Sequence, residues 1–285
     1  MYKLHNTFID KMIEKKLTSK EIDFILYIAN YQDQSGKIMS VYYKDICESI
    51  HISIQKFYDI LNDLSQKGIL TYKKEEYADV SVILNGNDFS DNNFSNGYLK
   101  VGTIDFQNEK FTKLKAGSKL LYLYMQRFTS GKHAKVSKFY EDFCELLGVK
   151  KKTIQAYIHE LKDAALLFVS LKRNKAYNYE MNLRNSTVIH KKWPIPHETE
   201  GHTSNFSSFI SRNFKRMLPK DKEKSQKAIH DTVSLIHTQR AKKYNDFSDR
   251  VVTAIKESFR IQILEGKKKP ILNAAYVNKC LTANL

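Results

Sequence analysis

The sequence predicts a mainly α-helical protein with small β hairpins, an α+β chain in which two similar domains precede a helical bundle. Three observations support this expectation. Residues 40–50, SVYYKDICESI, return 97 positions later as residues 137–147, SKFYEDFCELL, with five identities and three apolar exchanges. Each copy is followed by two β-prone runs, and the chain from Phe206 onward has helical periodicity. An internal repeat of this kind indicates a duplicated structural unit.

The first copy contains an ordered series of helix start and stop signals. Thr18 and Glu21 fit a capping box, Ser40 and Ser53 can each cap a further helix, and Gly68 can end the third. The two following runs are separated by a short polar segment, which is typical of a hairpin. Helices are therefore expected over about 18–31, 40–50 and 53–67, and strands over 69–74 and 79–84. Helix, helix, turn, helix and hairpin is the order of a winged helix.

The second copy repeats this order. Gly148 and Val149 form the expected turn, and the hairpin tip carries Lys172, Arg173, Asn174 and Lys175. Helices are expected over about 116–129, 137–147 and 151–164, and strands over 166–171 and 176–183. The chain is thus predicted to hold two winged helix-turn-helix domains in tandem.

Two segments read as linkers. Residues 87–97 are rich in turn formers and offer little to bury, and residues 191–204 contain two of the four prolines. Behind the second linker, amphipathic patterns predict two long helices and a short closing helix near 273–283. The expected domains are a winged helix at 1–86, a second at 98–190 and a basic helical bundle at 205–285.

Positive charge is confined to the later parts of the chain. The net charge is +16, but residues 1–97 carry 11 Lys and Arg against 14 Asp and Glu. Residues 98–190 carry 17 against 8, and residues 191–285 carry 19 against 9. This asymmetry indicates a polyanionic partner, because solubility alone would not require it; basic but idle solvated faces are the alternative.

Several function classes lack support in the sequence. The three cysteines form no CxxC pair and read as small core residues in a reducing compartment. No phosphate-binding GxxxxGK[ST] loop and no metal-ligand spacing are present, so we expect no enzymatic activity, no catalytic residue, no metal and no cofactor. No run is long and apolar enough for a membrane span, and a cytoplasmic location is expected.

The strongest candidate contacts to DNA lie in the second copy. The second helix of a helix-turn-helix enters the major groove. Consecutive lysines at a helix N-terminus oppose the helix dipole, so contact with phosphates explains them better than stability does. Gln155 suits a base edge, because its amide offers both a donor and an acceptor. The candidate residues are Lys150, Lys151, Lys152, Gln155 and His159 on the helix and Lys172, Arg173 and Lys175 on the wing.

The other two domains offer weaker candidates. In the first copy these are Gln55, Lys56, Tyr58 and Asn62, on a nearly neutral surface that either makes weak DNA contacts or binds protein, including a second copy of the chain. In the bundle, Arg212, Lys215 and Arg216 share a helical face, and Phe206, Phe209 and Phe214 either stack on bases or belong to the core.

The chain resembles a known group of DNA-binding proteins. Residues 97–127, GYLKVGTIDFQNEKFTKLKAGSKLLYLYMQR, are similar to the N-terminal winged helix of Gram-positive plasmid replication initiators and of the DnaD primosomal family. Residues 147–167 resemble their helix-turn-helix core, and NAAYVNKCL, residues 273–281, faintly resembles the closing helix of DnaD-like C-terminal domains. The tandem layout resembles iteron-binding initiators, in which one domain often dimerises and the other reads DNA.

The resemblance implies a sequence-specific double-stranded DNA-binding protein that recognises a plasmid or phage origin and recruits replication machinery. A helicase loader or another replication protein is the implied partner, with a homodimer formed through the first winged helix. Two alternatives stay open at this point. The chain could be a transcriptional repressor built from the same domains, or a protein-interaction adaptor of the primosome.

Overall fold

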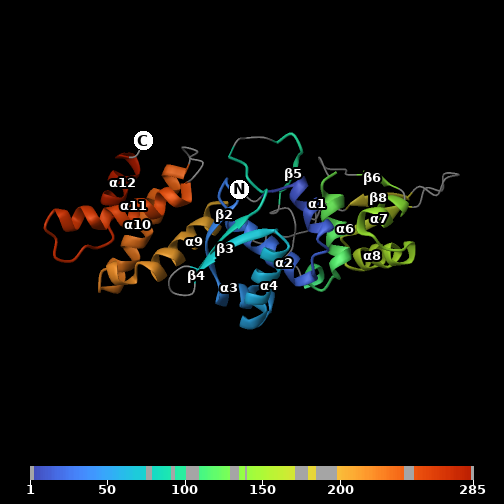
Figure 1. The fold of residues 1–285 in the computed structure, drawn as a ribbon, viewed down its shortest axis with the longest axis horizontal. Helices are drawn as coiled ribbons and strands as arrows, with labels where there is room; N and C mark the ends of the chain where they lie inside the picture. The colour runs from blue at the N-terminus through green and yellow to red at the C-terminus, as the bar shows by residue number, and fades with distance from the viewer. Residues whose placement is uncertain are drawn as a thin grey trace.

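The computed structural model describes residues 3–74, 79–90, 94–100, 109–128, 135–138, 140–170, 179–183, 198–240 and 247–283. The molecule is mainly helical and elongated (Figure 1). The C-terminal helices form one end, the first repeat the middle and the second repeat the other end. None of the described helices has the length and apolar character needed to cross a membrane.

The first repeat consists of three helices and a three-stranded antiparallel sheet. The helices are α2 (Ser19–Ile28), α3 (Tyr43–Ile50) and α4 (Ile54–Gln66), and a 3-10 turn, η1 (Ala29–Tyr31), extends α2. The strands are β2 (Lys37–Tyr42), β3 (Leu70–Lys74) and β4 (Asp79–Leu84), in the order β2-β4-β3. The predicted helices and hairpin are confirmed, except that α3 begins at Tyr43 and not at Ser40; β2 was not expected.

The second repeat has the same order of elements. Its helices are α6 (Ala116–Gln126), α7 (Tyr140–Leu147) and α8 (Lys151–Asp163). Its strands are β6 (Lys135–Lys138), β7 (Leu167–Ser170) and β8 (Tyr179–Leu183), in the order β6-β8-β7. Helices α7 and α8 begin and end 97 residues after α3 and α4. The structure therefore supports the duplication read from the sequence.

Two of the three predicted caps in the first repeat are present. Thr18 and Glu21 form a complete capping box on α2, and the Ser53 hydroxyl accepts a hydrogen bond from the Lys56 backbone on α4. The prediction for Ser40 is wrong. Ser40 lies in β2, and α3 begins at Tyr43 without a side-chain cap, because the strand runs directly into the helix. Ser137 in β6 occupies the equivalent position.

The two repeats share one hydrophobic core. Helix α1 (Asn6–Glu14), which the sequence analysis did not anticipate, packs on α6 and α7, and α2 also packs on α6. Strand β1 (Lys3–His5) pairs antiparallel with β5 (Tyr98–Lys100), so the chain segments that open each repeat are hydrogen-bonded together. A short helix, α5 (Glu109–Thr112), adds the buried Phe111. These contacts make the repeats a single packed body.

The segment 87–97 is more than a spacer. Asn87 is fully buried, and its side chain accepts a hydrogen bond from the His5 backbone and donates to Gln32 and to the Lys3 carbonyl. Phe89 is buried and stacks on the His5 ring. The expectation that this segment has little to bury is wrong at these two positions, because long-range contacts with the N-terminus supply the partners.

The C-terminal helices have their own core. They are α9 (Glu198–Asn213), α10 (Lys222–Arg240), α11 (Phe247–Leu264) and α12 (Ala274–Ala283), with a 3-10 turn, η5 (Lys215–Met217), behind α9. The predicted linker is helical from Glu198 onward, so residues 198–204 correct the expected irregular connection. Met39 of β2 joins this core, and α9 packs along β2. The bundle is therefore docked on the first repeat.

Candidate nucleic-acid interface

Helix α8 buries one face and exposes the other. Ile154, Ile158 and Leu161 are buried and recur at helical spacing, where α8 packs on α6, α7 and β7. The exposed side carries cationic, amide and imidazole groups, here named the α8 face: Lys150, Lys151, Lys152, Gln155 and His159. The structure therefore brings together all the helix candidates predicted in the second copy.

The lysines of the α8 face are weakly neutralised. The Lys151 Nζ lies 3.6 Å from the Glu141 Oε1, but these side chains are 53% and 73% exposed, and such ion pairs contribute little in water. Lys150 is the N-cap and provides no side-chain cap. Because the N-terminus of a helix carries partial positive charge, three lysines there favour a bound anion.

Two contacts that were not expected from the sequence hold α8 in place. The Glu160 carboxylate accepts a hydrogen bond from the Lys115 backbone N–H at 3.1 Å and another from the Ser118 hydroxyl, so it caps α6. Tyr157 packs closely over Gly117, where an added Cβ would lie 2.2 Å from the tyrosine ring. The first contact has a signal in the sequence. Lys115 occupies the position of the capping Thr18 in the first copy, and because a lysine side chain cannot accept a hydrogen bond, the cap of α6 must come from another residue.

The corresponding helix of the first repeat presents a different surface. Gln55 donates to Asp59 at 2.9 Å, and Asn62 accepts from the Tyr72 hydroxyl at 2.5 Å, so both amides have partners within the repeat. Tyr58 is half-buried against the Phe57 ring, and the Lys74 ammonium lies over it. Lys56 is exposed, and Ile54 is 52% exposed at the first helical position. This surface is mixed in character, with an exposed aliphatic group.

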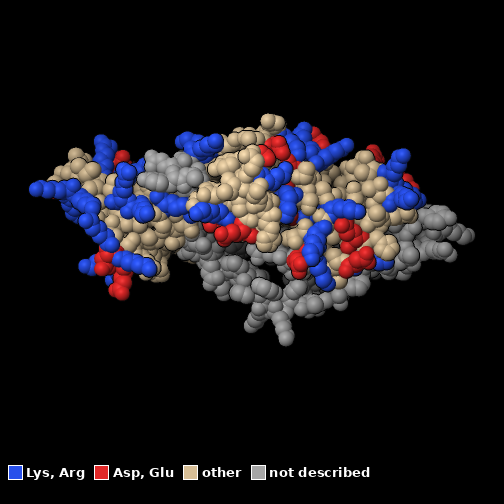
Figure 2. Space-filling model, turned by 90° about the horizontal axis from the view of Figure 1, so that it is seen from below, with Lys and Arg blue, Asp and Glu red and all other residues tan. Residues whose placement is uncertain are grey.

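The basic candidates of the bundle separate into two kinds. Arg212 is engaged with the first repeat: it donates to the Ser40 hydroxyl at 2.5 Å, and its guanidinium carbon lies 4.3 Å from the centroid of the Tyr42 ring. Lys215 and Arg216 are exposed in η5. Figure 2 shows Lys and Arg side chains spread over the end of the molecule formed by α10 to α12.

Base stacking by the bundle phenylalanines is contradicted by their burial. Phe206 and Phe209 are 7% and 5% exposed, and Phe214 is half-buried between the rings of Phe209 and Phe259. These side chains belong to the core of the bundle, so they offer no ring faces to a nucleic acid. The predicted wing residues Lys172, Arg173 and Lys175 lie outside the described residues.

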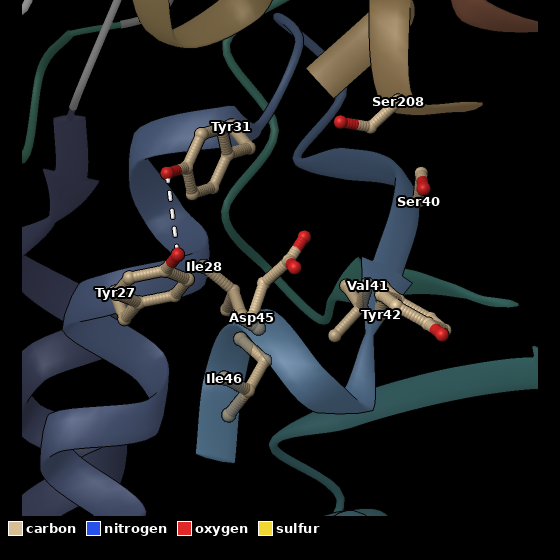
Figure 3. A pocket seen from close by; sticks show the side chains of 9 residues that line it. All are labelled: Tyr27, Ile28, Tyr31, Ser40, Val41, Tyr42, Asp45, Ile46 and Ser208. Carbon is tan, nitrogen blue, oxygen red and sulfur yellow. Dashed lines mark hydrogen bonds between the residues drawn. The ribbon is translucent and has the colours of Figure 1, made fainter. Parts of the chain in front are cut away.

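A pocket of about 290 Å³ lies between the first repeat and α9. In Figure 3 the Asp45 carboxylate points into the space between Tyr31 and Ser208, and the Tyr31 hydroxyl donates to that of Tyr27 at 3.4 Å. Most of its lining comes from the first repeat, so the pocket marks the seam at which the bundle docks. Over the described ranges, no three His, Cys, Asp or Glu side chains converge as a metal site would require.

One comparison with known proteins bears on this site. Residues 112–167 match the family model of a helix-turn-helix domain. The match begins at the end of α5 and covers α6, β6, α7 and α8, so the α8 face belongs to the matched helix-turn-helix. This match indicates DNA binding by the second repeat. No curated protein and no solved structure matches the chain.

Proposed function

We propose that the chain is a sequence-specific double-stranded DNA-binding protein without enzymatic activity, built of two tandem winged helices and a C-terminal bundle, and that it initiates plasmid or phage replication. The observation that carries the proposal is the α8 face. It places three lysines and an exposed amide on α8, the last of the three helices in the matched region and the second helix of the helix-turn-helix formed by α7 and α8. In such domains this helix enters the major groove.

The α8 residues have different roles in this proposal. Lys150, Lys151 and Lys152 contact phosphates, which gives affinity and salt dependence but carries no sequence information. Gln155, one turn further along the helix, faces a base edge and supplies specificity. His159 lies one turn beyond Gln155 and contacts the backbone at the end of the groove.

The packing of the two repeats favours an initiator over a repressor. Strand pairing between β1 and β5, and the packing of α1 and α2 on α6, fix the second repeat on the first within one chain. One chain can then present α8 to one DNA repeat without two-fold symmetry, which suits arrayed direct repeats. A repressor of the common kind pairs two identical chains across a palindrome.

A homodimer through the first winged helix is also part of this proposal. The surface of the first repeat left uncovered by α6 and α9 includes the exposed Ile54 on α4 and Ile83 on β4. Exposed aliphatic groups on a nearly neutral surface favour protein contact over phosphate contact.

Selection of bound duplexes from a random pool tests the proposal. The full chain is incubated with the pool at near-physiological salt, and the retained DNA is sequenced. Clustered direct repeats support an initiator, a single palindrome supports a repressor, and no enrichment supports the adaptor and overturns DNA recognition.

Gln155→Ala should relax the preference at one base position by about 1–3 kcal/mol, whereas Lys152→Ala should weaken binding to all sequences alike.

A further inference from the structure

The end of α11 and the loop behind it expose an unusual number of aliphatic side chains. Among the described residues, seven large hydrophobic side chains are exposed, and three of them lie within residues 263–271. Ile263 is 57% exposed, Leu264 77% and Ile271 40%. We name residues 263–271 the α11 tip. Clustered exposure of this kind marks an interaction surface more often than isolated exposure does.

The α11 tip has a fixed shape. The Gln262 side chain is fully buried, and it donates to the Ile271 carbonyl at 2.9 Å and accepts from the Ile271 backbone N–H at 3.2 Å. Gly266, with φ of +84°, ends the helix, and the Lys267 N–H returns to the Gln262 carbonyl. These bonds hold the loop in place, so binding there would require little additional ordering.

A second network fixes the charged groups of the tip. The Tyr276 hydroxyl donates to the Glu265 carboxylate at 2.5 Å and accepts from the Lys267 ammonium at 3.0 Å. Lys268 and Lys269 are exposed beside them. Glu265 is the one acidic residue of residues 263–271, and it already has a partner. The tip therefore combines exposed aliphatic groups with a cationic rim.

Three kinds of occupant fit this chemistry less well than an acidic protein. A nucleic acid would gain from the lysines but not from Ile263 and Leu264, since base stacking needs aromatic rings. A membrane-surface site usually adds exposed Trp or Tyr, whereas Tyr276 is half-buried and hydrogen-bonded. A second α11 tip would bring lysine against lysine.

We propose that the α11 tip docks an acidic, amphipathic segment of a partner protein, with aliphatic side chains against Ile263, Leu264 and Ile271 and carboxylates against Lys268 and Lys269. This inference rests on the proposed function and names the chemistry of the recruited protein. In Figure 1 the loop between α11 and α12 lies at the opposite end of the molecule from α8. One chain can therefore hold DNA and the partner at the same time.

A labelled peptide tests this inference on the full chain. The probe is a synthetic amphipathic helix with leucines on one face and glutamates on the other, and its binding is followed by fluorescence anisotropy. Affinity should fall about tenfold or more in Leu264→Ser and in Lys268→Glu with Lys269→Glu, because each removes a central contact. The matched controls are the exposed Phe128→Ser and Lys222→Glu with Lys224→Glu, which should bind like the parent chain.

Several results would overturn the inference. These are the absence of saturable binding, equal binding of a scrambled peptide of the same composition, or equal losses in the control variants. The tip variants could also bind the peptide unchanged but lose binding to anionic phospholipid vesicles or to single-stranded DNA. This result would show that the α11 tip binds a membrane or a nucleic acid and not a protein. Duplex selection separates this inference from the proposed function. The tip variants should still select the same duplexes as the parent chain. Lys151→Ala with Lys152→Ala should lose this DNA binding but still bind the peptide.

Discussion

A buried ion pair joins the two repeats at the scale of single residues. The Lys119 ammonium of α6 donates to the Asp23 carboxylate of α2 at 2.5 Å, and these side chains are 0% and 3% exposed. Burial raises the pKa of Asp23 and lowers that of Lys119, against the opposing effect of each partner. Desolvation is thus the larger effect on both groups, and we infer that the pair specifies how the repeats fit together more than it stabilises them.

Removal of one partner should be costly and dependent on pH. Lys119→Met leaves the Asp23 carboxylate buried without its cation, and we expect a loss of about 3–5 kcal/mol in the free energy of unfolding near neutral pH. Burial then keeps the pKa of Asp23 above its unfolded value, so the folded state binds the proton more tightly. In this variant the stability that depends on Asp23 is therefore retained below the pKa of Asp23 in the unfolded chain. It is lost as the pH rises through the pKa of Asp23 in the folded protein.

Urea denaturation at pH 5 and pH 7.5 measures this effect. Relative to the parent chain, Lys119→Met should lose less stability at pH 5. Asp23→Leu combined with Lys119→Met should recover most of the loss at both values, because no charge is then buried. An equal loss at the two pH values would contradict the assignment to Asp23 ionisation.

Gly117 is a second residue on which the site depends. It lies in α6 under the Tyr157 ring of α8, so Gly117→Ala must displace that ring. Overpacking costs about 1–3 kcal/mol, and because only the far end of the half-buried Tyr157 side chain must move, we expect a loss at the low end of this range, with a lower denaturation midpoint and weaker DNA binding. Gly117→Ala with Tyr157→Ala should regain part of the stability, because the ring no longer occupies the space. Failure of this rescue would place the strain elsewhere.

At the scale of elements, the α8 face makes a prediction about salt. Lys151→Ala with Lys152→Ala should lower the affinity for all duplexes and reduce the slope of log affinity against log salt by about two units. The exposed pair Lys222→Ala with Lys224→Ala, at the start of α10, is the matched control and should leave the slope unchanged. An unchanged slope in the α8 variant would remove this helix from the interface.

The elements that could be predicted are those with local signals. Periodic apolar residues and the caps at Thr18 and Ser53 predicted α2 and α4. Helix α8 could then be predicted because the repeat places it 97 residues after α4. Strand β2 was not predicted, because it leads directly into α3 and Ser40 therefore had the sequence pattern of a helix cap. Its identity depends on pairing with β4, a long-range contact that no local pattern encodes.

Contacts between domains lay beyond sequence reasoning for the same reason. Arg212 was predicted as a DNA contact from its place on a basic face, but in the structure it stacks on Tyr42. A cation in an amphipathic helix serves a phosphate or an aromatic ring equally well, and only the docking of α9 on β2 decides between them. A sequence signal did exist for Asp23, since it interrupts an apolar run.

At the scale of the whole molecule, the bundle is attached to the first repeat by a mixed set of contacts. Met39 enters the bundle core, Arg212 binds Ser40 and Tyr42, and Lys37 of β2 pairs with Asp249 of α11. Such polar contacts are individually weak, and the Asp249 side chain is 63% exposed. Attachment of the bundle should therefore be sensitive to the loss of Arg212, the one side chain that makes two of these contacts.

Hydrogen exchange can measure this attachment. In Arg212→Ala, amides of β2 and α9 should exchange faster than in the parent chain, because local opening of the seam costs less free energy. Amides of α7 and α8, in the distant second repeat, should keep their protection. Lys215→Ala, three residues along on the exposed η5 turn, is the control and should leave all four elements unchanged. Unaltered exchange in Arg212→Ala would mean that Met39 and the apolar contacts around it hold the bundle without the arginine.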